Sequence, residues 1–257
     1  MSEIKTNKKS PVFARLKVVG IVIVVVALFV YVFVLPAVDS LDEAVHHRDC
    51  WTHCRQIGVA LHNYHDKHGE FPPAYTVDAE GKRLHSWRTL LLPFLEHEDM
   101  YDKIKLDEPW DSEYNRQFHD QMPEVFSCWK AVKHFKWDKE LKKKWKNTMA
   151  AYQVVVGPET LFPGSERRTL DDVTRNKSET VAVVESTAGV CWMAPIDLPV
   201  EALEHGVVPA KSGILGVGSY HDGIVNAAMV DGSFESILNS KSPKDIQALK
   251  EQFRIKK

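Results

Sequence analysis

Three histidines, His62, His65 and His68, stand three residues apart in the stretch ALHNYHDKHGEFPPA. On a helix this spacing rotates each side chain by about 60° from the previous one, so the rings fan over about 120° of surface. Such pairs bind zinc when further ligands come from elsewhere, but no H-E-x-x-H motif accompanies them. We expect packing and hydrogen bonds at a helix end, with a metal held by His62 and His65 as the alternative.

A second group of polar residues lies near the C-terminus, in GSYHDGIVNAAMVDGS. Asp222, Asn226 and Asp231 offer the oxygen ligands that calcium prefers, although their spacing differs from that of an EF-hand loop. Ser219, His221 and Asp222 have the residue types of a catalytic triad, but residues so close along a strand point to alternating faces. We therefore expect no triad and no cofactor, with calcium as the weaker alternative.

The chain has four cysteines, Cys50, Cys54, Cys128 and Cys191. They permit three disulfide connectivities, and the spacing does not choose between them. Cys50 and Cys54 stand one helical turn apart, but no C-x-x-C pair or zinc-finger histidine spacing accompanies them. Disulfides persist in oxidising compartments, so they are expected if this part of the chain is exported, with buried free thiols as the alternative.

The N-terminal region indicates the compartment. Residues 18–35, VVGIVIVVVALFVYVFVL, carry no charge, and at about 1.5 Å per residue their helix would reach roughly 27 Å, close to the hydrocarbon thickness of a bilayer. Acids follow the run, and basic residues precede it, so the positive-inside rule predicts a cytoplasmic N-terminus. The basic residues are Lys5, Lys8, Lys9, Arg15 and Lys17.

These features predict three regions: a cytoplasmic basic tail over 1–17, a transmembrane helix over 18–36, and a periplasmic or otherwise extracytoplasmic domain over 37–257. A cleaved signal peptide is the alternative, but the apolar run is too long for it and no A-x-A site follows. The formal net charge is −2, which gives no reason to expect a nucleic-acid partner. The expected partners are the membrane and either an unknown envelope protein or a second copy.

The stretch from 41 to 68 predicts an amphipathic helix, because apolar positions recur three and four residues apart. It should end at Gly69, a residue suited to the C-cap, before Pro72 and Pro73. Membrane span and amphipathic helix are expected to form one long helix with a kink near Pro36. The positions expected to face the core are Leu41, Val45, Trp51, Cys54, Gly58, Leu61 and His65.

Shorter elements follow. Residues 86–104 predict a helix or two half-helices around Pro93, EVFSCW (124–129) a short strand, and the lysine-rich stretch 130–147 a solvated helical insertion, with polyanion binding as the alternative. AYQVVVGPET, ETVAVVESTAG and residues 218–238 predict strands, with Asp231-Gly232 as a hairpin turn. Ser242 and Pro243 should begin a closing helix. The expected fold class is α+β, with the long helix packed on an antiparallel sheet.

The stretch from Leu35 to Tyr75 is followed in order by SWRTLLLPFLE, WDSEYN, VVVGPET, TVAVVES and WMAPIDL. Nine residues then separate His221 from Asp231-Gly232. Together these motifs, over most of residues 35–238, resemble the bacterial family called domain of unknown function 1559. The resemblance implies a pilin-like or pseudopilin-like fold, and it makes the histidine stretch a family helix end rather than a metalloenzyme site.

The resemblance also bears on the cysteines and the N-terminus. Cys50 and Cys128 fall where the family commonly has cysteine, which makes a Cys50–Cys128 disulfide the first choice. Family members usually begin with a Gly-Phe-Thr-Leu-x-Glu prepilin signal, but KSPVFARLKVVGIVIVVV lacks it. Cys54, Cys191 and the lysine-rich stretch are further departures.

We therefore expect a membrane-anchored, pilin-like structural or interaction protein of the cell envelope, and not an enzyme. One alternative is an anchored metal-dependent hydrolase that uses the region of His62 and His65. The other is a calcium-stabilised pseudopilin.

Overall fold

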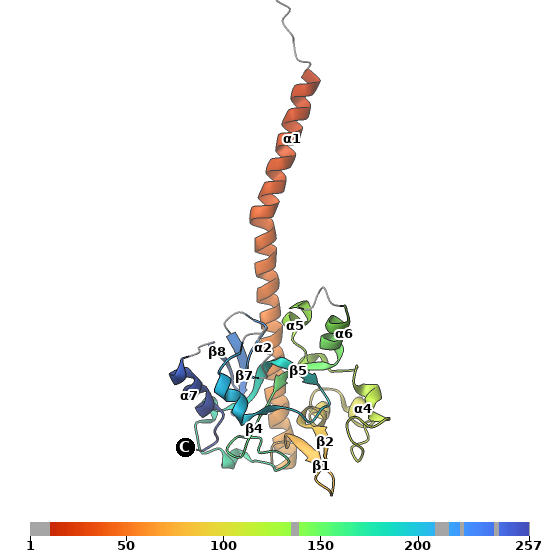
Figure 1. Cartoon of the computed structure of the whole chain (residues 1–257), viewed down its shortest axis with the longest axis vertical. Coiled ribbons are helices and arrows are strands. Elements are labelled where there is room, and N and C mark those ends of the chain that lie inside the picture. Colours follow the sequence, from red (N-terminus) through yellow and green to blue (C-terminus); the bar gives the residue numbers. More distant parts are fainter. Residues whose placement is uncertain (1–10, 135–138, 209–215, 222–223, 239–241, 257) are drawn as a thin grey trace, which may run out of the picture. The chain divides into compact units, whose positions relative to one another are not determined.

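The computed structural model describes residues 11–134, 139–208, 216–221, 224–238 and 242–256 (Figure 1). The chain divides into two compact units, residues 1–46 and residues 47–257. Each is described in turn below. The second unit is called the head.

The first unit is helical. Helix α1 (Pro11–Phe29) is followed directly by a π-helical turn, η1 (Val30–Val34), and by α2 (Leu35–His68), which continues into the head. Pro36 lies inside this helical run, just after the π-helical turn. A proline has no N–H to donate to the preceding turn, and the wider turn before it fits that missing bond.

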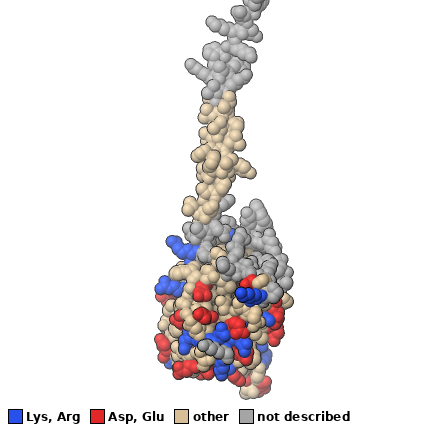
Figure 2. All heavy atoms as spheres, turned by 90° about the vertical axis from the view of Figure 1, so that its left-hand side faces the viewer, with Lys and Arg blue, Asp and Glu red and all other residues tan. Residues whose placement is uncertain are grey.

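One segment of this helix, Val19–Val38, is long and apolar enough to cross a membrane, and it is the only such segment in the described part of the chain. All its side chains are exposed. Figure 2 shows it as a stretch with neither acidic nor basic atoms. The predicted buried face was wrong at Leu41, which lies in the first unit and is 67% exposed.

The head part of α2 is amphipathic, as predicted. Its buried positions recur at helical spacing, and an added Cβ on Gly58 would lie 3.4 Å from the Ala228 side chain, so the helix packs closely on a strand. The helix ends at Gly69, whose φ of 78° suits a glycine C-cap. The buried side chains are Cys50, Cys54, Ile57, Ala60, Leu61 and Tyr64.

The helix packs on an antiparallel four-stranded sheet, so the expected α+β class is confirmed. The strand order is β3-β5-β7-β8. Two smaller sheets flank it: β1 pairs antiparallel with β2, and β4 pairs parallel with β6. The strands are β1 (Tyr75–Val77), β2 (Arg83–Ser86), β3 (Met149–Gln153), β4 (Val155–Val156), β5 (Val181–Cys191), β6 (Leu198–Pro199), β7 (Ile224–Met229) and β8 (Phe234–Leu238).

Short helices and turns connect these strands. The stretch 86–104 is broken into three pieces around Pro93, close to the two half-helices predicted, and the lysine-rich stretch is helical where described. The α-helices are α3 (Trp87–Leu90), α4 (Glu98–Tyr101), α5 (Trp129–His134), α6 (Lys139–Asn147) and α7 (Pro243–Gln252). The 3₁₀ turns are η2 (Leu92–Phe94), η3 (Asn115–Phe118), η4 (Glu124–Phe126), η5 (Leu170–Asp172), η6 (Lys177–Glu179) and η7 (Val200–His205).

The predicted strand at EVFSCW was wrong. Pro123 precedes it, and the Phe126 N–H donates to the Pro123 carbonyl over 3.1 Å while Ser127 N–H donates to Glu124 over 2.8 Å. These bonds close the 3₁₀ turn η4. The turn buries the apolar side chains of Val125 and Phe126. An apolar run this short does not distinguish a strand from a buried turn.

The predicted terminal hairpin is confirmed over β7 and β8. Gly232 has a φ of 82°, and the Asp231 carboxylate accepts a hydrogen bond of 2.8 Å from the Ser233 N–H. The first strand begins only at Ile224, so Ser219 and His221 lie in a loop rather than on the predicted strand. The closing helix α7 begins as predicted, with the Ser242 hydroxyl accepting from the Asp245 N–H.

A buried ion pair joins the head's layers. The Arg88 guanidinium donates to Asp197 at 2.6 Å, and both side chains are at most 1% exposed. Arg88 also donates to the Tyr152 carbonyl on β3 at 2.9 Å, and Trp87 Nε1 donates to Asp197 at 3.1 Å. This network links α3, β3 and the segment before β6, so each buried charge has several partners.

Candidate functional site

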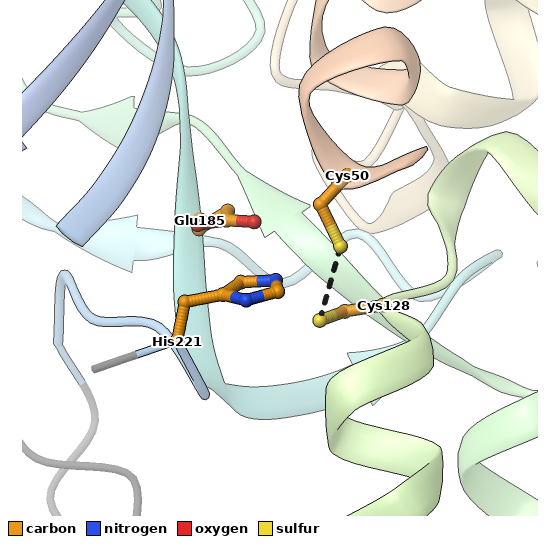
Figure 3. Close-up of side chains that lie close together, drawn as sticks. All are labelled: Cys50, Cys128, Glu185 and His221. Carbon is orange, nitrogen blue, oxygen red and sulfur yellow. Dashed lines mark hydrogen bonds between the residues drawn. The ribbon is translucent and has the colours of Figure 1, made fainter. Parts of the chain in front are cut away.

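Four side chains from distant positions in the sequence lie close together inside the head. Cys50, Cys128, Glu185 and His221 each offer one ligand-type atom, and these atoms lie within 4.8 Å of one another (Figure 3). All four residues are at most 5% exposed. We call this group the Cys-Cys-Glu-His cluster.

Cys50 and Cys128 are in direct contact. The Cys50 thiol donates to Cys128 Sγ over 3.4 Å, and both cysteines are free thiols. Tyr152 Oη donates to the Cys50 carbonyl at 2.9 Å. His53 Nδ1 donates to the carbonyl of Ser127 at 3.1 Å, which ties α2 to the segment just before α5. Helix α2 and this segment therefore hold the two sulfur atoms together.

Glu185 lies on β5, and its carboxylate is held by the neighbouring strand. Asn226 on β7 donates its backbone N–H to Oε2 at 2.9 Å and its side-chain amide to Oε1 at 3.1 Å. The register fits this contact, because Val184 on β5 pairs with Ala227 on β7. Burial raises the pKa of Glu185, although the hydrogen bonds from Asn226 oppose that shift.

The loop that carries His221 is pinned to the same strand. Gly218 N–H donates to the Glu185 carbonyl at 3.1 Å, and Tyr220 Oη donates to the Thr187 carbonyl at 3.2 Å. An added Cβ at Gly218 would meet the Val208 carbonyl oxygen at 2.4 Å, so the close approach requires glycine there. The loop thus holds the imidazole of His221 close to the sulfur atoms of Cys50 and Cys128.

The electrostatics disfavour a reactive thiolate. The hydrogen bond to Cys128 and burial raise the pKa of the Cys50 thiol well above its ordinary value of 9.0. Reactive cysteines are partly exposed and have depressed pKa values. For His221, burial lowers the pKa, but the hydrogen bond with Cys50 and the charges of Cys50 and Glu185 raise it by more. In the absence of a metal, the raised pKa of Cys50 argues against a thiolate nucleophile at this position.

The histidines that the sequence singled out have other roles in the structure. His65 packs its ring on Phe71 with centroids 4.9 Å apart, and its Nε2 accepts from the Leu170 N–H at 3.3 Å. The His62 ring lies 6.0 Å from the same phenylalanine. Among the residues the structure describes, neither belongs to a group of three metal-ligand side chains. His68 stacks on Tyr64, with centroids 4.2 Å apart.

The predicted calcium ligands are spread over different local environments. Asn226 is buried and bonds to Glu185. Asp231 is exposed and accepts from Ser233 within the hairpin turn. Asp222 lies outside the described residues.

The remaining cysteines lie outside the cluster. Cys54 is fully buried one turn along α2, and burial raises its pKa. Cys191 ends β5 and is partly exposed. The predicted Cys50–Cys128 pair is brought into contact, but the disulfide itself stays a prediction because both sulfurs are thiols here.

The sequence does not predict the cluster as a site, although three of its members carry other expectations. The family resemblance implies a disulfide between Cys50 and Cys128 and makes His221 part of a motif. The missing signal was Glu185, one acid inside the apolar strand sequence TVAVVES. A buried strand that keeps a carboxylate indicates a partner for it, because burying an unpaired charge is costly.

No curated protein and no solved structure matches this chain significantly. A family model described as "Protein of unknown function (DUF1559)" matches residues 47–192, more than half of the 257 residues. The match covers Cys50, Cys128 and Glu185, while His221 and Asp231-Gly232 follow it. On this match, the chain belongs to the DUF1559 family.

Proposed function

We propose that this chain is a permanently membrane-anchored, pilin-like structural or interaction protein of the bacterial cell envelope. Its N-terminus would remain in the cytoplasm, its head would lie outside, and the head would have no catalytic activity. The observation that carries the proposal is the segment Val19–Val38, which is apolar throughout and has every side chain exposed.

The physical reason is that an exposed apolar segment of this length requires an apolar environment rather than water. Soluble proteins rarely expose contiguous apolar surface of this extent. A helix satisfies its own backbone hydrogen bonds, so the segment suits the hydrocarbon core of a bilayer. The five basic residues before it favour a cytoplasmic N-terminus.

The pilin-like part of the proposal is supported by the head. The C-terminal part of α2 buries its apolar face on an antiparallel sheet, as expected for the long helix of a pilin-like fold. The missing prepilin signal argues for a tethered subunit rather than a processed filament subunit. The non-catalytic part is supported by the burial of all four side chains of the Cys-Cys-Glu-His cluster, which are at most 5% exposed.

Orientation is tested with protease on intact bacterial spheroplasts that carry the full chain with a C-terminal tag. The tag should be degraded from outside, while the N-terminal peptide survives until the membrane is opened. A matched variant replaces the basic flank with glutamine and should lose the orientation bias. A parent whose tag is protected and whose N-terminus is cleaved would contradict the proposal. The replaced residues are Lys5, Lys8, Lys9, Arg15 and Lys17.

A further inference from the structure

We propose that the Cys-Cys-Glu-His cluster is a structural zinc site, with Cys50, Cys128, Glu185 and His221 as its four ligands. The site would join four segments of the head: α2, the segment before α5, strand β5 and the loop before β7 (Figure 3). This inference does not depend on the anchoring proposed above.

The ligand types favour zinc. Zinc is bound by cysteine sulfur, histidine nitrogen and carboxylate oxygen, almost always with four ligands in structural sites. Calcium and magnesium prefer all-oxygen sites, so two sulfur atoms disfavour them. Tetrahedral sets of sulfur and nitrogen ligands are typical of zinc among the divalent metals.

The sulfur spacing agrees with a shared ion. Two thiolates each about 2.3 Å from one zinc ion, at a tetrahedral angle, lie roughly 3.8 Å apart. The sulfur atoms of a disulfide lie about 2.05 Å apart. The observed Cys50–Cys128 distance of 3.4 Å is closer to the first value, and the four ligand atoms lie within 4.8 Å of one another.

The charge balance gives a reason for a cation at this place. Glu185 is 2% exposed, and Asn226 donates neutral hydrogen bonds to both its oxygens, which leave its negative charge in place. The Ser219 side chain gives this carboxylate a further hydrogen bond, and a carboxylate with about four lone-pair sites still has one to offer a metal. With both cysteines as thiolates, Glu185 ionised and His221 neutral, a divalent ion would offset two of the three negative charges in a region where uncompensated charge is costly.

Burial indicates a structural rather than a catalytic site. All four ligands come from the protein, so no coordination position remains for water or substrate. Successive ligands are 78, 57 and 36 positions apart along the chain. A metal ion that joins them would restrict the unfolded chain as a crosslink would. A Cys50–Cys128 disulfide would use both sulfur atoms and would therefore exclude this site.

The first test uses the full chain, purified from membranes in mild detergent without chelator. Thiols are alkylated in the native protein at neutral pH, before and after chelation, and metals are measured by mass spectrometry. We expect about one zinc ion per chain, with Cys50 and Cys128 reduced but protected from alkylation until zinc is chelated. Zinc-free protein with a Cys50–Cys128 disulfide, or with both thiols freely alkylated, would overturn the proposal.

Variants identify the ligands. Cys50→Ser, Cys128→Ser and His221→Gln should each lower zinc content about tenfold. The matched control is Cys54→Ala, which alters a buried cysteine one turn along the same helix and should keep its zinc. Zinc retained in the Cys50 and Cys128 variants, or lost only in the control, would place the metal elsewhere and overturn the proposal.

A second measurement remains informative if a ligand variant fails to fold. Cobalt(II) replaces zinc in the parent protein after mild chelation. Two thiolate ligands should give sulfur-to-cobalt charge-transfer absorption, and the tetrahedral geometry should give strong visible bands. Octahedral cobalt spectra without charge transfer would overturn the proposal.

Discussion

The apolar segment Val19–Val38 and the Cys-Cys-Glu-His cluster differ in how the sequence encodes them. The apolar segment is a run of 20 neighbouring residues, all exposed. The cluster takes single residues from positions 50, 128, 185 and 221, all buried. The first property is local and belongs to composition, whereas the second exists only after the sheet and helix have assembled.

This contrast predicts a division of labour. In the function proposed above, the apolar helix would set the location of the protein, whereas the stability of the head would depend on buried polar contacts that join distant segments. Substitutions that remove buried contacts in the head should therefore change the free energy of unfolding strongly. Removal of the N-terminal helix should change it little.

The largest effect is expected at the buried ion pair. Asp197→Ala leaves the buried Arg88 guanidinium without its 2.6 Å partner, which should lower the free energy of unfolding by about 3–5 kcal/mol. Urea unfolding of the full chain in detergent, followed by tryptophan fluorescence, measures this. The control is Glu108→Gln, which breaks the exposed pair with Lys105 and should leave the midpoint unchanged. A parent-like midpoint for Asp197→Ala would count against the role given to this pair.

A smaller effect is expected in the terminal hairpin. Gly232→Val forces a β-branched residue to a φ of 82° and places its Cβ 3.2 Å from the His62 ring, so we expect a loss of about 1–3 kcal/mol. Gly81→Val is matched, since Gly81 has the same φ of 82° but no atom within 4 Å of an added Cβ. Thermal unfolding should show a greater loss at Gly232. Equal losses would remove the His62 contact from the explanation.

A modest, pH-dependent effect is expected at η5. The backbone N–H of Thr169 donates to Asp172 at 2.8 Å and depresses the pKa of that carboxyl below 3.8. A depressed folded pKa gives stability above the unfolded pKa that is lost as pH falls through the folded value. Asp172→Asn should therefore cost about 1 kcal/mol near neutral pH and converge with the parent at lower pH. Asp171→Asn is the control, and a cost that stays constant with pH would contradict the capping role.

The smallest effect is expected from removing the anchor. Deletion of residues 1–38 should release a soluble head whose free energy of unfolding changes by less than about 1 kcal/mol. The reason is that, among the side chains of α2 that the structure describes, the buried ones begin at Cys50, inside the head. Equilibrium unfolding of the released head, compared with the full chain in detergent, checks this. An aggregated or molten product would show that the N-terminal helix contributes to folding.

Much of the fold was predictable because its signals are local. The helix end at Gly69, the Asp231-Gly232 turn and the Ser242 cap each rest on one residue's backbone or hydrogen-bonding preference. The prediction at EVFSCW failed because Pro123 starts a turn that an apolar pattern does not reveal. The prediction that Leu41 faces the core failed because periodicity does not show where along a helix its packing partner begins.

The candidate site was less predictable for a physical reason. Metal-site motifs are recognisable when several ligands share one helix or loop, whereas here each ligand comes from a different element. Glu185 and Asn226 are joined through the β5–β7 register, which nothing in either strand's sequence specifies alone. The three histidines of α2, by contrast, are conspicuous through their spacing, yet His62 and His65 pack on Phe71 and His68 stacks on Tyr64.

The central claim is that this DUF1559 protein stays in the membrane with its N-terminus intact. It is tested most directly by N-terminal peptide mapping of the full chain taken from alkali-washed membranes. We predict a mature start before Lys17 in protein that alkali does not extract. A mature start between Lys17 and Asp39, or release of the protein by alkali, would contradict a permanent anchor and favour a processed filament subunit or a secreted protein.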